Sequence, residues 1–219
     1  MGRPTASEPR ARKSGENGDV PNEELGPWDP LRPEDAEAEF ATWSARWWMA
    51  GGWAIDLFLG RQTRDHGDLD VLVLRRDQAL VREALGGWDV HAADPPGSLR
   101  PWPLGETLPP AVHDIWCRRG PTSAWAFQLM LDDTDGDDWL FRRDHRIRRP
   151  VESLAGRASS ANLAVLSPEI QLLYKSKGLR DKDEADFQAA RLYLSAADRA
   201  WLREALDIVA PGHPWIRDL

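Results

Sequence analysis

Two aspartates, Asp68 and Asp70, lie one residue apart where the chain enters the apolar run 69–74. Side chains two positions apart on a β-strand point to the same face, so both carboxylates can aim at one point. Their like charges repel, and a bound divalent cation would relieve that repulsion. Magnesium is normally held by one or two carboxylates together with substrate phosphates. The pair therefore predicts a Mg²⁺ site, which would also spare the apolar strand an unpaired Asp70 carboxylate.

A glycine pair, Gly51 and Gly52, lies upstream between a predicted short strand (47–50) and a predicted helix (53–59). Without Cβ atoms, a chain that turns from strand to helix can bring its backbone N–H groups close to a phosphate. A lone Gly-Gly is weak evidence, because any tight turn can use it. Followed by the aspartate pair, it indicates a phosphate-binding turn next to a metal site, and hence nucleotide chemistry.

The loop before the aspartates carries Arg64 and His66. An arginine here could bind a triphosphate with both ends of its guanidinium, or it could simply face solvent. We assign Arg64 to nucleotide binding because it is close in sequence to the aspartates. We expect His66 to shape the loop rather than act as a base, and Asp56 to hydrogen-bond to the same loop.

The string GGWAIDLFLGRQTRDHGDLDV, residues 51–71, resembles the core of the aminoglycoside-2''-adenylyltransferases and of the related lincosamide nucleotidyltransferases. These families belong to the nucleotidyltransferase superfamily that includes DNA polymerase beta. The shared motifs are GGWaiD (here 51–56), G-R-x-T-R (60–64) and H-x-D-h-D (66–70). The resemblance implies Mg²⁺-dependent transfer of a nucleoside monophosphate from ATP, or another nucleoside triphosphate, to a hydroxyl of a small molecule such as an aminoglycoside antibiotic.

The resemblance also implies that a lysine from the C-terminal helices contacts the nucleotide phosphates. Lys175 and Lys177 lie in a basic run of an acidic chain. Such a run is usually a solvated helix face. Ile170, Leu172 and Leu173 nevertheless give this helix a side that faces the protein. We therefore assign both lysines to nucleotide binding as alternatives.

A third catalytic carboxylate is implied by the resemblance, on a strand that follows the Asp-x-Asp strand. The expected strand is 125–132, and the position where the acid should align holds Gln128, whose amide cannot accept a proton. Asp132 shares its strand parity but lies about 13 Å further along unless the strand bends. We therefore take Asp132 as the third catalytic residue and Asp114 as the alternative. A site with neither would have an altered or lost activity.

The composition narrows the class of protein. With 219 residues and 42% hydrophobic residues, the chain can fold around a sizeable core. Its net charge of −8 argues against nucleic-acid binding and suits a cationic small acceptor attracted by an acidic cleft. A single cysteine, Cys117, fits a reducing cytoplasm. No run of eighteen apolar residues and no apolar signal-peptide region is present, so we expect a cytoplasmic protein without membrane contact.

The expected fold class is α+β. Residues 1–27 are polar and without periodicity, which predicts a disordered tail. We expect a nucleotidyltransferase-type core at residues 28–150, in which helices flank a mixed β-sheet. We expect a small helical C-terminal region at residues 151–219. Within the core we expect a long loop at 92–110 and a hairpin formed by 112–118 and 125–131.

Three other functions remain open from the sequence. Gln128 would suit a nucleotide-binding protein whose transferase activity is degenerate or lost. A nucleotidylating toxin acting on tRNA or protein is another possibility, although the negative net charge disfavours tRNA. An Asp-x-Asp glycosyltransferase fits least well, because the upstream glycine turn has no place in it.

Overall fold

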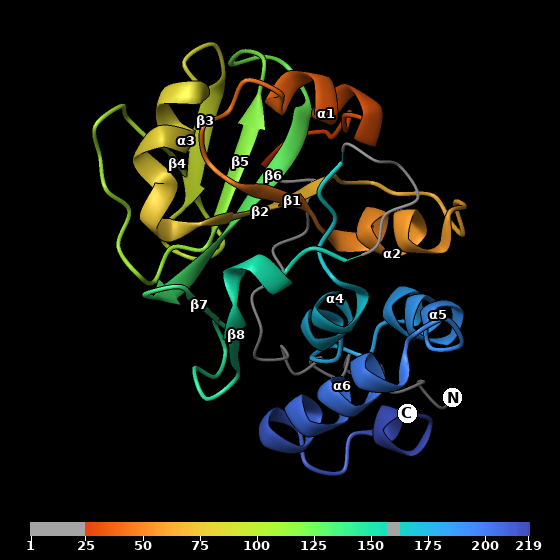
Figure 1. Cartoon of the computed structure of the whole chain (residues 1–219). Helices are drawn as coiled ribbons and strands as arrows, with labels where there is room; N and C mark the ends of the chain where they lie inside the picture. The colour runs from red at the N-terminus through yellow and green to blue at the C-terminus, as the bar shows by residue number, and fades with distance from the viewer. Residues whose placement is uncertain (1–24, 157–162) are drawn as a thin grey trace, which may run out of the picture.

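The computed structural model describes residues 25–156 and 163–219, and most of the predicted tail 1–27 lies outside these residues. Its centre is a sheet of eight strands in which six follow the order β1-β2-β6-β5-β3-β4, with β7 and β8 added beyond the far half of β6 (Figure 1). The strands are β1 (Trp47–Met49), β2 (Asp70–Leu74), β3 (Asp89–Ala93), β4 (Leu99–Pro101), β5 (Asp114–Arg118), β6 (Trp125–Asp135), β7 (Asp138–Leu140) and β8 (Arg148–Pro150).

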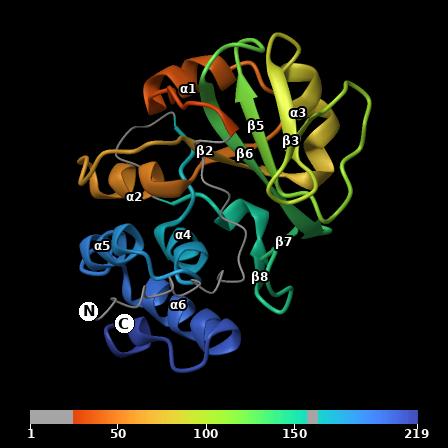
Figure 2. The same ribbon diagram turned by 180° about the vertical axis from the view of Figure 1, so that it is seen from behind.

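The helices lie on both sides of this sheet. They are α1 (Pro33–Phe40), α2 (Gly51–Leu59), α3 (Gln78–Ala84), α4 (Pro168–Lys175), α5 (Asp181–Ala190) and α6 (Ala196–Val209), with short 3₁₀ segments at Arg75–Asp77, Val151–Ser153 and Pro214–Arg217. Figures 1 and 2 show α1 and α3 against the sheet and α4, α5 and α6 packed together below it. The predicted α+β class is confirmed, and the predicted domain boundaries at 27 and 150 stay predictions.

Strand β2 is paired on both sides, antiparallel with β1 and parallel with β6. Its register with β6 places Asp70 opposite Gln128 and Leu74 opposite Asp132. Strand β5 joins the other side of β6 as the predicted hairpin, with Asp114 opposite Met130. Because successive side chains alternate between faces, Asp70 and Gln128 share one face of the sheet.

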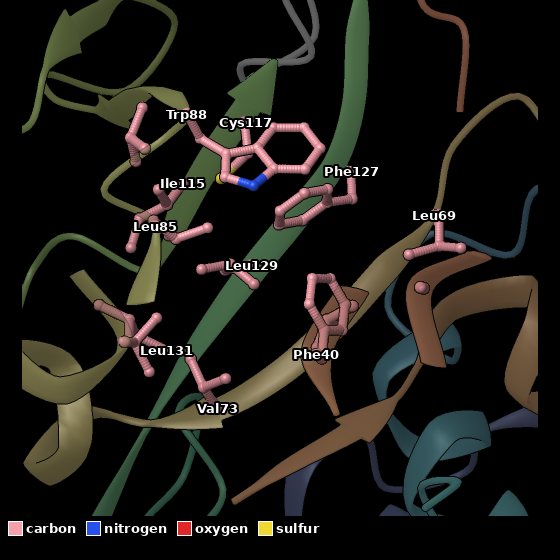
Figure 3. Packing of buried hydrophobic residues seen from close by; sticks show 14 of the residues in the cluster. Phe40, Leu69, Val73, Leu85, Trp88, Ile115, Cys117, Phe127, Leu129 and Leu131 are labelled. Atoms are coloured by element: carbon pink, nitrogen blue, oxygen red, sulfur yellow. The ribbon is translucent and has the colours of Figure 1, made fainter. Parts of the chain in front are cut away.

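Each face of the sheet is covered by its own hydrophobic core. Val73, Leu129 and Leu131 belong to the core that Phe40 of α1 enters from one side (Figure 3). Leu72 belongs to the second core, which α4, α5 and α6 form on the other side. A sheet covered on both faces explains why residues 71–74 are all apolar. Asp70, at the first position of β2, shares the second face.

The segment before α4 fixes that helix to the edge of the sheet. The Met49 backbone N–H donates to the Ala164 carbonyl (2.8 Å), and the Leu166 N–H donates to the Met49 carbonyl (2.9 Å). Pro168 then occupies the first position of α4, where its missing N–H costs no helical hydrogen bond. Residues far apart in sequence are thereby held beside the end of β1, where the glycine pair begins.

Two helix ends show well-known capping arrangements. Gly60 ends α2 in the left-handed conformation (φ 67°), and Ser195 caps α6 with a reciprocal bond to Asp198. The predicted loop 92–110 is wrong in part, because it contains β4, which pairs with β3. The Pro and Gly residues of this segment favoured the loop prediction. The three-residue strand β4 lies at the edge of the sheet, where proline is tolerated. No helix in the described part of the chain is long and apolar enough to cross a membrane.

Leu129→Ala should destabilise the protein by about 2–5 kcal/mol, because this fully buried side chain lies on the central strand β6 and its loss would leave a cavity. The measurement is urea unfolding followed by circular dichroism. Leu192→Ala is the matched control: Leu192 is 70% exposed, and its removal should change the free energy of unfolding by less than about 0.5 kcal/mol. Equal effects of the two substitutions would contradict the assigned core.

Candidate active site

The two aspartates line an open cleft of about 720 Å³ on the second face of the sheet. Asp70 is the first residue of β2, whereas Asp68 lies just before the strand rather than in it. Both keep part of their surface exposed, and Gln128 from β6 lines the same cleft. The cleft therefore forms where β2 and β6 present polar side chains on the second face of the sheet. The helices that cover the rest of this face leave that part of the sheet uncovered.

Gly51 and Gly52 face this pair as the first two residues of α2, rather than in a turn before it. Gly51 has φ 66°, and a Cβ atom there would collide with the Asp70 carboxylate. A Cβ atom on Gly52 would collide with the Arg64 guanidinium and the His66 ring. The Gly51 N–H donates to Oε1 of Gln171 (2.8 Å), so this donor already has a partner from α4.

Burial and neighbouring negative charge together raise the pKa of Asp70 to about 7. Burial disfavours its charged form first, and the nearby charge of Asp68 adds to the effect, with a smaller contribution from Asp114. Lys175 and Lys182 act in the opposite direction. The chain thus brings together two carboxylates that oppose each other's ionisation, which is what a cation would relieve.

Within residues 25–156 and 163–219, no group of three or more His, Cys, Asp or Glu side chains is arranged to hold a metal ion. The donor set of the cleft is therefore the oxygen pair of Asp68 and Asp70. Two carboxylate ligands are what Mg²⁺ uses when substrate phosphates and water complete its octahedron. The residues present fit magnesium in that form, and do not fit a metal held by protein ligands alone.

The predicted nucleotide-binding cations separate into two kinds of environment. Arg64 forms a two-bond pair with Asp186 (Nε–Oδ1 and Nη2–Oδ2, both 3.0 Å), and Lys175 contacts the same carboxylate (2.8 Å) as well as Asp183 (3.4 Å). Both Arg64 and Lys175 line the cleft. Lys177 is exposed and is not among the lining residues.

Asp186 stays ionised in this network. Burial opposes its charge, but hydrogen bonds and nearby charge from Arg64 and Lys175 lower its pKa below the usual value. Since the side chains of Asp183 and Asp186 are each only 1% exposed, the two cations are held by α5 from behind the cleft.

His66 supports the loop, as its spacing predicted. Its Nε2 lies 2.6 Å from Asp56 Oδ2, and the Thr63 hydroxyl donates to the other oxygen of Asp56. The His66 ring packs on Trp53, with ring centroids 4.3 Å apart. His66 is not among the lining residues of the cleft, and its contacts with Asp56 and Trp53 hold the loop that carries Arg64 against α2.

The sequence predicted Asp132 as the third catalytic carboxylate, and the structure does not bring this residue to the cleft. Asp132 is fully buried in the second core, accepts hydrogen bonds from Trp139 Nε1 (2.6 Å) and the Tyr174 hydroxyl, and does not line the cleft. Burial raises its pKa. The shared strand parity with Gln128 is real, but β6 does not bend Asp132 back toward Asp70.

Asp114 lies in the cleft instead. Gln128 Nε2 donates to its Oδ1 (3.1 Å), and Arg142 Nη1 donates to the same oxygen (3.3 Å). Its side chain is 37% exposed. Gln128, which aligns with the expected acid, thus uses its amide to bind the Asp114 carboxylate of the neighbouring strand β5.

Arg142 and Arg143, in the connection between β7 and β8, were missed by the sequence reasoning. Both line the cleft and lie over the ring of Tyr174. The dipeptide sits in an irregular segment without periodicity, and only its charge could have signalled it.

The expected acidic cleft is wrong, because basic side chains outnumber acidic ones among the lining residues. The acidic ones are Asp68, Asp70 and Asp114, and the basic ones are Arg64, Arg142, Arg143, Lys175, Arg180 and Lys182. Net charge describes a whole chain and does not say where its charges gather.

Comparison with known proteins places this cleft in a family context. A family model described as aminoglycoside-2''-adenylyltransferase matches residues 35–92, which include the glycine pair and both aspartates. No curated protein matches the chain.

Solved structures share the fold. A solution structure of the antibiotic-resistance factor ANT(2'')-Ia has a TM-score of 0.51 at 18% identity, covering 80% of this chain and 90% of that one. The lincosamide antibiotic adenylyltransferase LnuA, bound to lincomycin, has a TM-score of 0.50 at 15% identity, covering 74% and 97%. A crystal structure of ANT(2'')-Ia with adenylyl-2''-tobramycin scores 0.49 at 16% identity, covering 79% and 94%. The match over residues 35–92 and the shared fold show that the chain resembles the aminoglycoside-2''-adenylyltransferase family in both its N-terminal motif and its architecture.

Proposed function

We propose that this protein transfers a nucleoside monophosphate, with ATP as the first candidate donor, to a hydroxyl group of a small molecule in the cytoplasm. The observation that carries the proposal is the cleft in which Asp68 and Asp70 face the glycine start of α2, with Arg64 and Lys175 beside them. This arrangement offers carboxylates for a metal and cations for phosphates within one cavity.

Asp68 and Asp70 would hold Mg²⁺ together with the triphosphate. When bound, the metal would neutralise charge on the phosphates and favour departure of pyrophosphate. Arg64 and Lys175 are positioned in advance by Asp186, so they add positive potential without having to reorganise. Lys182, which also lines the cleft and acts on Asp70, extends that potential.

Asp114 is our choice for the proton acceptor. It lines the cleft, its charge acts on Asp70, and it keeps over a third of its side-chain surface exposed. The acceptor oxygen would bond to the α-phosphorus, the bond from that phosphorus to the pyrophosphate oxygen would break, and the hydroxyl proton would pass to Asp114. Asp132 lacks this access, because it is fully buried between Trp139 and Tyr174.

A second function is favoured by one observation. Gln128, and not an acid, lies opposite Asp70 in the register of β6. If Asp114 cannot accept the proton, the protein would bind nucleotide and transfer it slowly. We do not extend the proposal to an antibiotic as acceptor, since lincomycin and tobramycin are ligands of the compared proteins.

Asp70→Asn should abolish Mg²⁺-dependent binding of ATP, because one of the two carboxylate ligands becomes a neutral amide. The melting temperature without metal should stay level or rise at pH 8, since a like-charge contact with Asp68 is removed. Calorimetric titration with Mg-ATP and thermal melts in EDTA measure the two effects. Asp65→Asn, an exposed aspartate of the same loop, is the control and should bind normally. Unfolding of Asp70→Asn would show that the residue is structural.

The contribution of Asp70 to the stability of the metal-free protein should fall as the pH rises from about 4 to about 7. The folded-state pKa of Asp70 is about 7, above its ordinary value of 3.8, so this group binds more protons in the folded protein than in the unfolded chain in this window. Urea unfolding in EDTA at pH 5 and pH 8 should therefore show that the free energy of unfolding of Asp70→Asn, relative to that of the unmodified protein, increases as the pH rises. A pH-independent difference between the two proteins would contradict the assigned cause.

Asp114→Asn should lower the rate of pyrophosphate release by about 10²–10⁴-fold while leaving Mg-ATP binding intact, as loss of a general base does. The assay follows pyrophosphate with tobramycin, lincomycin or water as the acceptor. Adding Gln128→Glu to Asp114→Asn should restore part of the rate by putting an acid opposite Asp70. An unchanged rate in Asp114→Asn, with a dead Asp132→Asn that still folds, would assign the base to Asp132.

A further inference from the structure

We propose that the acceptor carries an anionic group, a phosphate or a carboxylate, close to the hydroxyl that receives the nucleotide, and that Arg142 and Arg143 bind it. This inference rests on the proposed function. It adds a substrate class that the resemblance does not imply, because the argument comes from two arginines that the matched segment 35–92 does not contain.

The two arginines form one positively charged surface. The guanidinium carbon of Arg142 lies 5.3 Å from the centroid of the Tyr174 ring, and that of Arg143 lies 5.5 Å from the same centroid. Arg143 Nη1 donates to the Tyr174 backbone carbonyl (2.8 Å), which fixes its side chain against α4. These contacts fix the positions of the guanidinium groups, and both arginines line the cleft.

The two arginines have few ion-pair partners, although the charges of Asp114 and Asp132 act on both of them. Asp114 is the partner of Arg142, with a long contact of 3.3 Å. Arg143 forms no ion pair with any carboxylate in the described part of the chain. Burial, together with the charge of Arg142, lowers the pKa of Arg143. A bound anion would relieve that repulsion, and guanidinium forks match phosphate and carboxylate oxygens in pairs.

The position of the pair assigns that anion to the acceptor rather than to the triphosphate. Lys175 and Lys182 are the cations that act most on Asp70, at the metal end of the cleft. Arg142 instead contacts Asp114, the proposed proton acceptor. A general base must come within hydrogen-bond distance of the hydroxyl it deprotonates. The group beside that hydroxyl is then within reach of Arg142 and, across the Tyr174 ring, of Arg143.

The same charges disfavour a polycationic acceptor. A hydroxylated polyamine would have to place ammonium groups against Arg142 and Arg143, where like charges repel. The cleft volume of about 720 Å³ is in the range of small-molecule sites. A compact hydroxylated anion satisfies both conditions.

The test uses the full-length protein saturated with Mg²⁺ and a non-hydrolysable ATP analogue. The probes are glycerol 3-phosphate, glycerate, glycerol and tobramycin, which separate phosphate, carboxylate, neutral and polycationic acceptors. Calorimetry should show at least one anionic probe binding about tenfold or more tightly than glycerol, and tobramycin binding more weakly than that anion.

The variants are Arg143→Gln and Arg143→Glu. Loss of a charge-assisted contact should weaken binding of the preferred anion about tenfold in Arg143→Gln, and charge reversal should improve binding of tobramycin relative to the anion. The control is Arg146→Gln, in the same connection: Arg146 is 70% exposed, pairs with Asp144 and does not line the cleft. It should bind every probe as the unmodified protein does.

The outcomes separate this inference from the proposed function. If tobramycin binds best, or if Arg143→Gln binds the anions as well as the unmodified protein, the inference is overturned while Mg-ATP binding still supports the transferase. If the ATP analogue itself does not bind with Mg²⁺, the proposed function fails first. Failure of all four probes to bind to a protein that holds Mg²⁺ and the analogue also overturns the anionic site.

Discussion

The contact between the Asp70 carboxylate and the backbone of Gly51 sets the geometry of the cleft. Gly51 has φ 66° and no room for a Cβ atom, so α2 can begin directly against the first residue of β2. Gln171 accepts the Gly51 N–H and ties α4 to the same point. Asp70 and the glycine start of α2, which we propose to bind the metal and the phosphates, are therefore held against each other by one close approach.

The charged side chains around the cleft are arranged so that the Asp70 carboxylate can lie this close to Gly51. Asp70 is already hard to ionise, and only nearby cations favour its charged form. Lys175 is 7% exposed and would be a costly unpaired charge without Asp183 and Asp186 on α5. The C-terminal helices thus do more than cover the sheet: they carry the buried carboxylates that keep cations beside the cleft before any nucleotide arrives.

The sequence predicts the parts of the site that depend on neighbours in the chain. Gly51, Gly52 and Asp70 follow from turn chemistry and strand alternation, which are local properties. Asp132 was misplaced although its parity was right, because parity fixes the face of a strand and not the distance along it. Whether that position faced the cleft or the second core depended on how far α4 extends over the sheet.

Residues that reach the site through strand pairing could not be read from the sequence in the same way. Asp114 arrives because β5 joins β6 in one register, with Trp116 opposite Gln128. A shift of one residue would turn Asp114 to the opposite face of the sheet. Arg142 arrives from a connection without any periodic pattern. Local sequence patterns say least about the pairing register of strands that are far apart in the sequence and about irregular loops.

The placement of Gln128 has a physical reason in this arrangement. An acid there would lie directly opposite Asp70, whose pKa is already raised by burial and by the charges of Asp68 and Asp114. Asp114 lies one diagonal step away on β5, where Arg142 offsets its charge and Gln128 donates to it. A carboxylate at position 114 instead of position 128 lowers the repulsion at Asp70. If Asp114 is the proton acceptor, as we propose, the acceptor hydroxyl would lie near Arg142 and Arg143, so the proposed base and the proposed charge of the acceptor are linked.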